Sequence, residues 1–390
     1  MRAKVNGKLK KLALFGNSFF LKCKLSAFIN LPLLLMKTLR EHTLAELEEL
    51  MLSWQEPKFR AKQVYEWIWE KYTNDIAEMS NLSKALREKL AAHFALNTVS
   101  VHEVQTSSDG TMKSRFQLHD KHFIEGVLIP TDKRVTACVS SQVGCSLTCK
   151  FCATGYMKRL RNLEAQEIVD EVMLINEQAQ KNYGKKLTNI VFMGMGEPLL
   201  NYKNVMKAIE QITSPEGMAM SPRRITLSTA GVAKMIRQLG DDQTKVKLAL
   251  SLHAATDEKR NEIMPINETN NLAAIIDALQ YFYKCTKTHV TFEYILFKGF
   301  NDSKRDADDL IKIYRQVPCD LVNVIEYNPI DNADFEKPDE KVTDEFMAYL
   351  TAQKVNTRLR HSRGKDIDAA CGQLANVNLR KLDEQLGAAK

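Results

Sequence analysis

Residues 138–161 of the chain read CVSSQVGCSLTCKFCATGYMKRLR, and this stretch decides both the fold and the chemistry. It places Cys145, Cys149 and Cys152 in the spacing C-x3-C-x2-C, with the aromatic Phe151 just before the last cysteine. Soft thiolate ligands select zinc, copper(I) or iron–sulfur clusters. A structural zinc or a fully ligated cluster needs four ligands, and no fourth cysteine or histidine completes a local C-x2-C pair. Three thiolates therefore indicate a four-iron cluster with one open iron, which can bind a substrate.

A zinc knuckle or a group of buried apolar thiols is the alternative interpretation of these cysteines. The pattern C-x3-C-x-aromatic-C closely resembles the motif of the radical S-adenosylmethionine (SAM) superfamily. This resemblance implies that Cys145, Cys149 and Cys152 are the metal ligands of a [4Fe-4S] cluster, whose open iron chelates the amino and carboxylate groups of SAM.

The composition of the chain is that of an ordinary globular protein. It has 390 residues, of which 44% are hydrophobic and 26% charged, so it can hold two or more domains. Its formal charge of +7 equals the seven Lys and Arg of residues 1–35, which contain no Asp or Glu. The rest of the chain is near neutral, so nucleic-acid binding must depend on local basic patches such as 158–161, 223–224 and 358–365.

The first 35 residues join a basic stretch to the apolar run LSAFINLPLLL at 25–35. The run is too short to span a membrane, and no small-residue cleavage site follows it. We expect residues 1–35 to be a doubtful leader and translation to begin at Met36, which intact mass of the natively expressed protein would test. Without an export signal, eight cysteines predict a cytoplasmic protein with ligand or catalytic thiols and no membrane partner.

Residues 36–105 predict a small helical accessory module, because they combine apolar helical periodicity with little Gly or Pro. Lys58, Arg60 and Lys62 open one of its helices, which is typical either of an ordinary core-facing helix or of an RNA-contacting surface. Residues 106–134 predict a β-rich lead-in, since apolar and polar residues alternate from His102 onward around the turn at 107–110.

From residue 135 to 376 the pattern alternates strands with helices, followed by a tail at 377–390. Strands are expected at 135–140, 189–193, 224–228, 246–252, 289–295 and 321–326, and helices at about 164–182, 202–213, 231–239, 271–284, 303–316 and 340–354. Six strand–helix units predict an α/β fold in which a parallel sheet curls into a partial (β/α)6 barrel. In such folds the functional residues collect at the carboxyl ends of the strands.

Unusual residues do follow the predicted strands. The run MGMGEPL at 193–199 follows the second strand and resembles the GGEP element of the superfamily, which holds the amino group of SAM. Gly196 permits close backbone approach, and Glu197 would pair with the ammonium group. Other strand ends are expected to complete the SAM site, with strand-end capping as the alternative role; they carry Ser228, Ser251, Leu252, His253 and Asn328.

Two further cysteines are not explained by the cluster. Cys138 lies seven residues before Cys145, and Cys371 lies near the far end of the chain. The cations at 358–365 precede Cys371, where they would favour its thiolate and could also contact phosphate.

The whole chain from about 37 to about 376 resembles the bacterial dual-specificity RNA methyltransferases, which place a methyl group on C2 of adenine. The resemblance depends on six sequence segments: CVSSQVGCSLTCKFCATG at 138–155, MGMGEPLLNY at 193–202, RRITLSTAG at 223–231, LALSLHAA at 248–255, EYILFKGFND at 293–302 and SRGKDIDAACGQL at 362–374. It implies two RNA partners, 23S rRNA, modified at adenosine 2503, and some tRNAs, modified at adenosine 37. Both bases must be presented from folded RNA.

The same resemblance implies a mechanism. C2 of adenine is electron-poor and cannot attack the methyl sulfonium of SAM, so a radical route is needed. Cys371 would take a methyl group from one SAM, and a second SAM, cleaved by the cluster with an electron from a flavodoxin-type donor, would generate the radical that joins this carbon to C2. Glu125 would then accept the C2 proton, and Cys138 would release the product through a transient disulfide with Cys371.

Two alternatives stay open at this point. The paralogous family that methylates C8 of the same adenine shares the five cysteines, so their spacing does not exclude it. A non-catalytic iron–sulfur protein that binds RNA or senses redox state is the alternative from another class. It would leave Cys371, the MGMGEP turn and Ser251 to His253 without a use.

Overall fold

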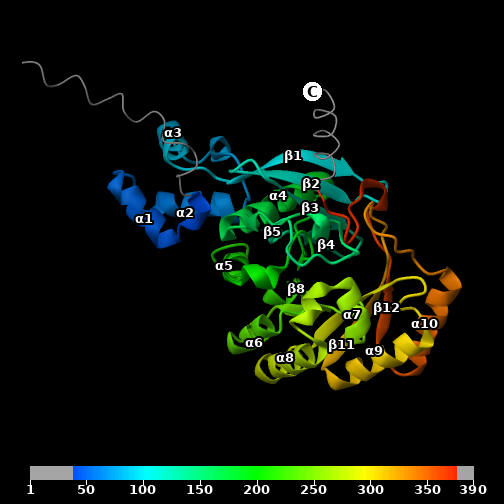
Figure 1. Ribbon diagram of the computed structural model, residues 1–390. Coiled ribbons are helices and arrows are strands. Elements are labelled where there is room, and N and C mark those ends of the chain that lie inside the picture. Colours follow the sequence, from blue (N-terminus) through cyan, green and yellow to red (C-terminus); the bar gives the residue numbers. More distant parts are fainter. Residues whose placement is uncertain (1–37, 376–390) are drawn as a thin grey trace, which may run out of the picture.

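The computed structural model describes residues 38–375. The expected leader at 1–35, the expected start at Met36 and the tail at 377–390 lie outside the described residues. Figure 1 shows a helical module, coloured blue, at one end of the molecule, next to a large sheet. None of the helices between residues 38 and 375 is long and apolar enough to cross a membrane.

The N-terminal module is a group of short helices around a small apolar core. Its first long helix begins at a capping box, in which Thr43 accepts a hydrogen bond from the Glu46 N–H and the Glu46 carboxylate accepts one from the Thr43 N–H. Fully buried apolar side chains such as Leu47, Val64 and Leu90 hold the helices together. The elements are η2 Leu39–Glu41, α1 Leu44–Ser53, α2 Phe59–Trp69, η3 Ile76–Glu78 and α3 Lys84–His93.

A single 10-stranded sheet follows, in the order β1-β2-β3-β4-β7-β8-β9-β10-β11-β12. Its first part is antiparallel and consists of β1 Val99–Thr106, β2 Met112–Leu118 and β3 Phe123–Pro130, which pairs with β4 Val135–Cys138. These three strands span 99–130, whereas the β-rich lead-in was expected at 106–134. Pro130 stands at the last position of β3, where a missing N–H costs least.

The second part of the sheet is parallel and runs from β4 to β12. It adds β7 Asn189–Phe192, β8 Ile225–Thr229, β9 Lys247–Ser251, β10 Val290–Leu296, β11 Cys319–Glu326 and β12 Thr357–Arg360. All six predicted strands are confirmed, with ends shifted by a few residues, and so is the α/β class. Strand β12 was not predicted, because TRLR contains one apolar residue. A separate small sheet pairs β5 Gln142–Val143 with β6 Arg161–Asn162.

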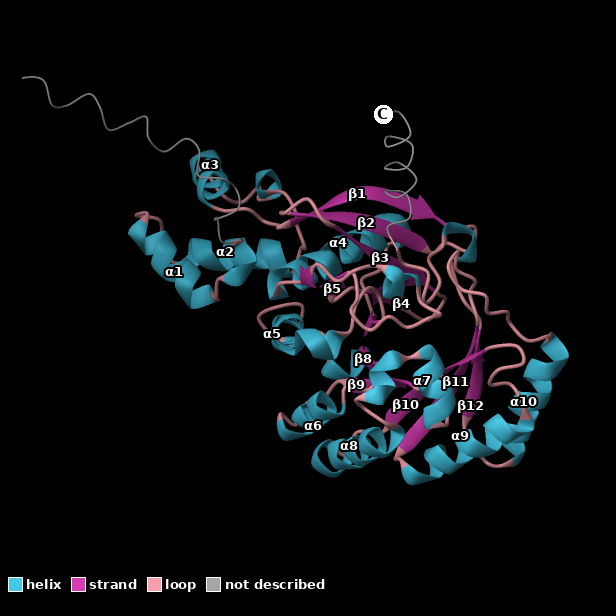
Figure 2. Cartoon of the chain, viewed as in Figure 1, coloured by secondary structure: helices cyan, strands magenta, loops and turns pink. Residues whose placement is uncertain are grey.

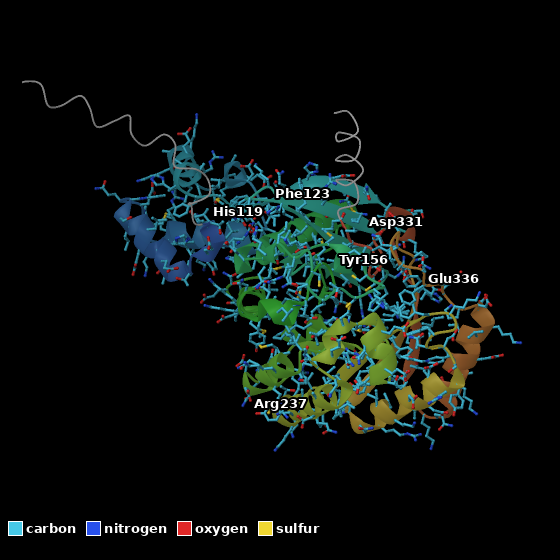
Figure 3. The ribbon with its side chains drawn as sticks, in the orientation of Figure 1. His119, Phe123, Tyr156, Arg237, Asp331 and Glu336 are labelled. Atoms are coloured by element: carbon cyan, nitrogen blue, oxygen red, sulfur yellow. The ribbon has the colours of Figure 1, made fainter. Side chains whose placement is uncertain are left out.

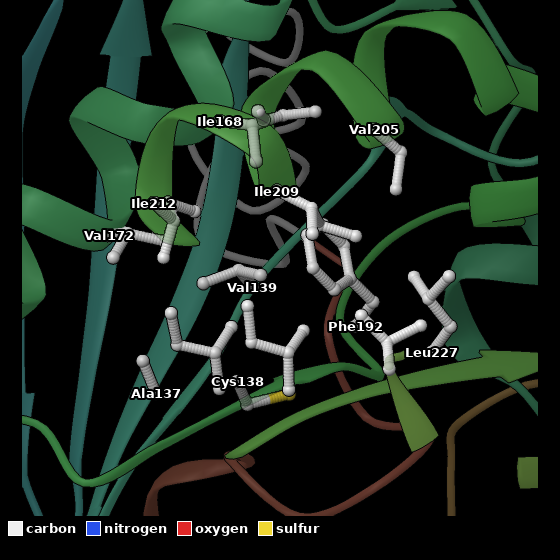
Figure 4. Packing of buried hydrophobic residues seen from close by; sticks show 14 of the residues in the cluster. Ala137, Cys138, Val139, Ile168, Val172, Phe192, Val205, Ile209, Ile212 and Leu227 are labelled. Atoms are coloured by element: carbon white, nitrogen blue, oxygen red, sulfur yellow. The ribbon is translucent and has the colours of Figure 1, made fainter. Parts of the chain in front are cut away.

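The helices between the parallel strands lie on the outside of the sheet, as Figure 2 shows for α6, α8, α9 and α10. They are α4 Ala165–Tyr183, α5 Tyr202–Thr213, α6 Ala233–Asp241, α7 Asp257–Ile263, α8 Leu272–Thr286, α9 Lys304–Gln316 and α10 Glu340–Ala352. The six predicted helices are confirmed. Helix α7 was missed because its seven residues, DEKRNEI, carry one apolar side chain. Figure 4 shows Ile168 and Val172 of α4 packed with Ile209 of α5 close to Val139 and Phe192.

A buried ion pair fastens the N-terminal module to α4. Both Arg40 and Asp170 have fully buried side chains, and Arg40 Nη1 lies 3.3 Å from Asp170 Oδ1. Arg40 also donates to the carbonyls of Leu96 at 3.0 Å and Thr73 at 2.9 Å, while the Thr98 N–H donates to Asp170 at 2.6 Å. The charges are therefore paired and hydrogen-bonded from both sides, which is the condition for burying them.

Replacing Arg40 with methionine is expected to lower the free energy of unfolding by about 3–5 kcal/mol, because it leaves Asp170 buried without its counter-charge. The measurement is the shift in the denaturant midpoint of the full chain. Lys84→Met is the matched control, since Lys84 is 85% exposed and pairs with Glu88 across one helical turn. That pair should contribute less than about 0.5 kcal/mol. Equal shifts for the two variants would contradict the expectation.

Candidate active site

The carboxyl ends of the parallel strands open into one cavity, and most of the predicted site residues line it. They come from the loop after β4, the turn after β7 and the ends of β8 and β9, and Cys371 joins them from the far end of the chain. The predicted residues in the lining are Cys145, Cys149, Cys152, Gly196, Glu197, Ser228, Ser251, His253 and Cys371. Residues spread over more than two hundred positions thus meet in one place.

The three-cysteine loop is held by its own backbone and by an aromatic anchor. The N–H of Cys145 donates to the Met157 carbonyl at 3.4 Å, and the N–H of Cys152 donates to the Cys149 carbonyl at 3.2 Å. Phe151 is 7% exposed and packs edge-on against His253, with ring centroids 4.7 Å apart. The aromatic residue before the last cysteine therefore turns inward and fixes the loop. Tyr156, labelled in Figure 3, marks where the loop returns to the surface, with 39% exposure.

The thiols of this loop fit a cluster better than a single ion. Burial raises the pKa of Cys145 to about 11 and also raises the pKa values of Cys149 and Cys152, so the thiolates need a bound cationic centre. Within residues 38–375, no three Cys, His, Asp or Glu side chains lie close enough to hold one metal ion. A zinc knuckle is therefore not supported. In a cluster each thiolate binds a different iron, so the three sulfurs need not converge on one point.

Gly196 and Glu197 form the turn that the sequence assigned to the amino group of SAM. Gly196 has a φ of +93°, and an added Cβ would lie 2.5 Å from Gln142 Cβ, so glycine is required. Glu197 is 3% exposed and accepts from the N–H groups of Leu199 at 3.1 Å and Ala230 at 2.8 Å. Burial raises its pKa to about 7, although the side chain of Thr229 also donates a hydrogen bond to this carboxylate. A cationic amine in the cavity would keep this carboxylate ionised.

The remaining strand-end residues divide into two groups. Ser228 and Ser251 face the cavity with their hydroxyls 3.2 Å apart, and the His253 Nδ1 accepts from the Ile295 N–H at 3.2 Å. Burial lowers the pKa of His253 to about 3, so its ring is neutral. Leu252 does not line the cavity: its side chain is fully buried in the core. Asn328 does not line it either, but its side-chain amide donates to the Cys371 carbonyl at 3.2 Å.

Cys138 and Cys371 are far apart in the sequence but lie near enough in the fold for Cys371 to affect the pKa of Cys138. Gly372, next to Cys371, accepts a 2.7 Å hydrogen bond from the Ala153 N–H, which places Cys371 beside the cluster loop. Cys138 stands at the end of β4 and is 9% exposed. Burial, reinforced by the neighbouring Cys371, raises the pKa of Cys138 to about 12. Both are free thiols, so a formed disulfide between them, expected from the resemblance as a transient state, is not present in the structure.

Glu125 lies apart from this cavity. It is 5% exposed on β3, and its Oε2 accepts a 3.0 Å hydrogen bond from the N–H of Ala375, just beyond the Cys371 segment. It borders a small separate hollow with Glu103, Gln105, Lys113 and Arg115. The structure therefore places the expected proton acceptor beneath the C-terminal segment and not in the lining of the cluster cavity.

Two charged residues of the cavity lining were not among the predicted site residues. Glu293 of β10 and Arg360 of β12 both face the cavity, where Arg360 Nη1 lies 3.3 Å from Glu293 Oε2. The sequence contains one sign of this pair, because Glu293 places a carboxylate within the apolar strand VTFEYIL. A buried Glu needs a partner of opposite charge. From the sequence, Arg360 was considered only as one of the cations at 358–365 that precede Cys371.

The basic patch expected at 158–161 offers fewer free cations in the structure than the sequence suggested. Arg161 forms ion pairs with Asp120 and Glu167 and is therefore not free to bind phosphate.

Comparisons with known proteins show which family the chain belongs to. The chain matches the model of the ribosomal RNA large subunit methyltransferase N-terminal domain over residues 37–96 and that of the radical SAM superfamily over residues 139–311. It is 54% identical to the probable dual-specificity RNA methyltransferase RlmN of Cytophaga hutchinsonii over 87% of this chain and 93% of the relative. The corresponding protein of Campylobacter hominis is 42% identical over 90% of this chain and 99% of the relative.

Among solved structures, the chain resembles a radical SAM methyltransferase from Sphaerobacter thermophilus. The TM-score is 0.82 at 40% sequence identity, and the match covers 87% of this chain and 99% of that chain. The two family models together match the N-terminal module at residues 37–96 and most of the parallel part of the sheet at residues 139–311. The chain thus belongs to the dual-specificity RNA methyltransferases of the radical SAM superfamily.

Proposed function

We propose that Cys371 carries the methyl group in the reaction of this chain. As a member of its family, the protein methylates C2 of adenosine 2503 in 23S rRNA and of adenosine 37 in tRNA. The observation that carries the proposal is the position of Cys371, which lines the same cavity as Cys145, Cys149 and Cys152 although it is more than two hundred residues away. A thiol at this position is within reach of the chemistry that a bound cluster and SAM would supply.

Membership of the superfamily implies a [4Fe-4S] cluster and SAM. When bound, the cluster and SAM supply one-electron reductive chemistry and a methyl group. The chain's own residues would hold them: the three cysteines hold the cluster, and Gly196 and Glu197 receive the amine. We propose two SAM molecules per turnover and an external flavodoxin-type electron donor. We also propose a cytoplasmic location, where the reducing environment keeps thiols free.

Three side chains of the protein, Cys371, Glu125 and Cys138, carry out the remaining steps. Cys371 receives a methyl group on its sulfur. The one-electron chemistry that the cluster and SAM would supply removes one hydrogen atom from that carbon, which then bonds to C2 of the adenine, and takes up the electron that is released when the C2 proton leaves, so RNA and protein are joined. Glu125 accepts the C2 proton. Cys138 then attacks the Cys371 sulfur: an S–S bond forms, the S–C bond breaks, and the carbon keeps the electron pair and takes a proton to become the product methyl. A dithiol reductant restores both thiols.

Glu125→Gln is expected to lower the turnover rate by about 10²–10⁴-fold, because an amide keeps the shape of the side chain but cannot accept a proton. Methylation of Cys371 itself should be unchanged in this variant. The measurement is the rate of RNA methylation together with the mass of the Cys371 peptide. Glu103→Gln is the matched control, since Glu103 borders the same small hollow. Equal rates for the two variants would remove Glu125 from the reaction.

We propose that residues 36–105 form an accessory module that contacts the RNA. The domain model that matches this part of the chain is named for the ribosomal RNA methyltransferases. Lys58 and Lys62 are exposed near the start of α2, next to Phe59, which is 57% exposed. An exposed aromatic ring between cations suits stacking on an unpaired base and contact with phosphate.

The proposed reaction is tested by the product nucleoside. The enzyme with reconstituted cluster is incubated with SAM, reductant and an rRNA fragment, and the digested RNA is compared with 2-methyladenosine and 8-methyladenosine standards. We expect 2-methyladenosine. Formation of 8-methyladenosine would replace the C2 assignment, and absence of both with SAM unconsumed would favour a non-catalytic iron–sulfur protein.

A further inference from the structure

Gln142 stands at the base of the loop that carries the three cluster cysteines. It begins β5, which pairs with β6, so the chain leaves this two-stranded sheet before Cys145 and returns to it at Asn162. The two-stranded sheet is separate from the 10-stranded sheet, whose strand ends form much of the cavity. Contacts other than sheet pairing must therefore fix the cysteine loop relative to the turn at 193–199.

The side chain of Gln142 links both ends of the cysteine loop to Glu197. Its Oε1 accepts a hydrogen bond from the Glu197 N–H at 3.0 Å, and its Nε2 donates to Asn162 Oδ1 at 2.7 Å. The backbone adds to this link, because the N–H groups of Ser141 and Gln142 donate to the Met195 carbonyl at 2.8 and 3.2 Å. One side chain thus joins the start of the loop, its end and the turn that carries Glu197.

The link is buried and closely packed. Gln142 is fully buried, and a Cβ added to Gly196 would lie 2.5 Å from the Gln142 Cβ and 2.7 Å from its Cγ. An amide suits this place because one planar group offers both an acceptor oxygen and donor hydrogens. Removing the oxygen would leave the Glu197 N–H without its acceptor in the protein interior, which is costly.

A SAM molecule in the cavity would contact two separate segments. Its amine would meet Glu197, and its binding to the cluster would depend on the loop that carries Cys145. A ligand that joins two segments binds more tightly when their spacing is set beforehand, because ordering them on binding costs affinity. Gln142 does not line the cavity, so it would act through the two segments that it joins.

We propose that Gln142 is a positioning residue that sets the spacing between the cysteine loop and the Gly196–Glu197 turn before SAM binds. The inference rests on the proposed function, because it concerns how one SAM molecule reaches both segments. Gln142 makes no bond to SAM in this account. Its effect is on the affinity of the site and not on the chemical step.

The test measures the Kd of SAM by equilibrium dialysis with the cluster-loaded enzyme, in a Cys371→Ala background so that no methyl group is transferred. Gln142→Met keeps the length of the side chain without the acceptor and donor of the amide, and it should raise the Kd by about tenfold or more. Gln142→Glu should raise it by less than about threefold, because burial favours the neutral acid, which has an acceptor oxygen and an O–H donor. Iron and sulfide content per chain shows whether each variant holds its cluster.

Kinetics with RNA separate positioning from a general loss of structure. In otherwise wild-type enzyme, Gln142→Met should raise the KM for SAM by about tenfold or more and keep kcat within about threefold, because saturating SAM restores the spacing. Fewer folded molecules would instead lower kcat and leave KM unchanged. The matched control is Gln178→Met, which should leave both constants unchanged. Gln178 is a half-buried glutamine of α4 that accepts from the Ser114 hydroxyl and does not line the cavity.

Unchanged Kd and KM in a Gln142→Met enzyme that holds its cluster would overturn the inference, and so would equal losses in Gln142→Met and Gln142→Glu. If Gln142→Met holds no cluster, Asn162→Ala decides, because it removes the second partner of the amide at a half-buried position. A Kd raised by about threefold or more would then support the inference, and an unchanged Kd would overturn it.

Failure of the proposed function gives a different result. A wild-type enzyme that binds SAM but produces no methylated adenosine would remove the proposed function alone. The dialysis needs no methyl transfer, so it would still decide the role of Gln142.

Discussion

Cys371→Ala is expected to reduce RNA methylation by more than about 10³-fold, because it removes the atom that carries the methyl group. The side chain lies in the cavity of the cluster cysteines, with its segment fixed by the Gly372 and Asn328 contacts. Alanine keeps those backbone contacts, so the loss should come from chemistry and not from misfolding. The measurement is methyl transfer to an rRNA fragment under saturating SAM.

The matched control is Cys285→Ala, which removes a described free cysteine that does not line the cavity. This variant should keep the wild-type rate within about twofold. A Cys371→Ala protein with an intact cluster that still methylates RNA at more than about a tenth of the wild-type rate would contradict the assignment, since a 10³-fold loss is expected from removing an essential nucleophile.

Cys138→Ala has the second large effect, and it should stop the reaction at a different stage. Cys138 is the thiol beside Cys371 that can attack its sulfur, so the variant should still join RNA to protein and then fail to release it. We expect repeated turnover to fall by about 10³-fold or more, while a covalent adduct accumulates on the order of one per enzyme.

Cys319→Ala is the control for this variant. Cys319 is a half-buried free thiol on β11, and it does not line the cavity, so its removal should neither trap an adduct nor slow release. If Cys138→Ala lost methylation without any adduct, Cys138 would act before the RNA is joined, for example in folding the cavity. Normal turnover in Cys138→Ala would remove it from the reaction altogether.

The fold was largely predictable because its signals are local. Each inner parallel strand is a short apolar run, and the helices between them carry apolar residues at helical spacing, as in α4. Strand β12 and helix α7 were not predicted because their sequences are mostly polar or charged, and only tertiary packing determines their structure. In both cases a neighbour stabilises the element: β11 pairs with β12, and Arg260 of α7 is fully buried.

The site residues that belong to a local sequence motif could be predicted. The site residues that come together only in the folded chain could not. The three cysteines and the Gly196–Glu197 turn are local patterns with a chemical reason. The ion pair of Glu293 and Arg360 forms only in the folded sheet, so no sequence spacing predicts it. Leu252 shows the reverse case: it lies between two cavity residues just past the end of β9, but its side chain is fully buried in the core.

The central claim is that the methyl carbon reaches RNA through the sulfur of Cys371, and peptide mapping of the trapped adduct tests it most directly. Cys138→Ala enzyme is loaded with SAM carrying an isotopically labelled methyl group, incubated with RNA, and digested with nuclease and protease. We expect the labelled carbon to join the Cys371 peptide to adenine, and the adduct to disappear in Cys138→Ala/Cys371→Ala. Label on another peptide, or an adduct without the label, would contradict it.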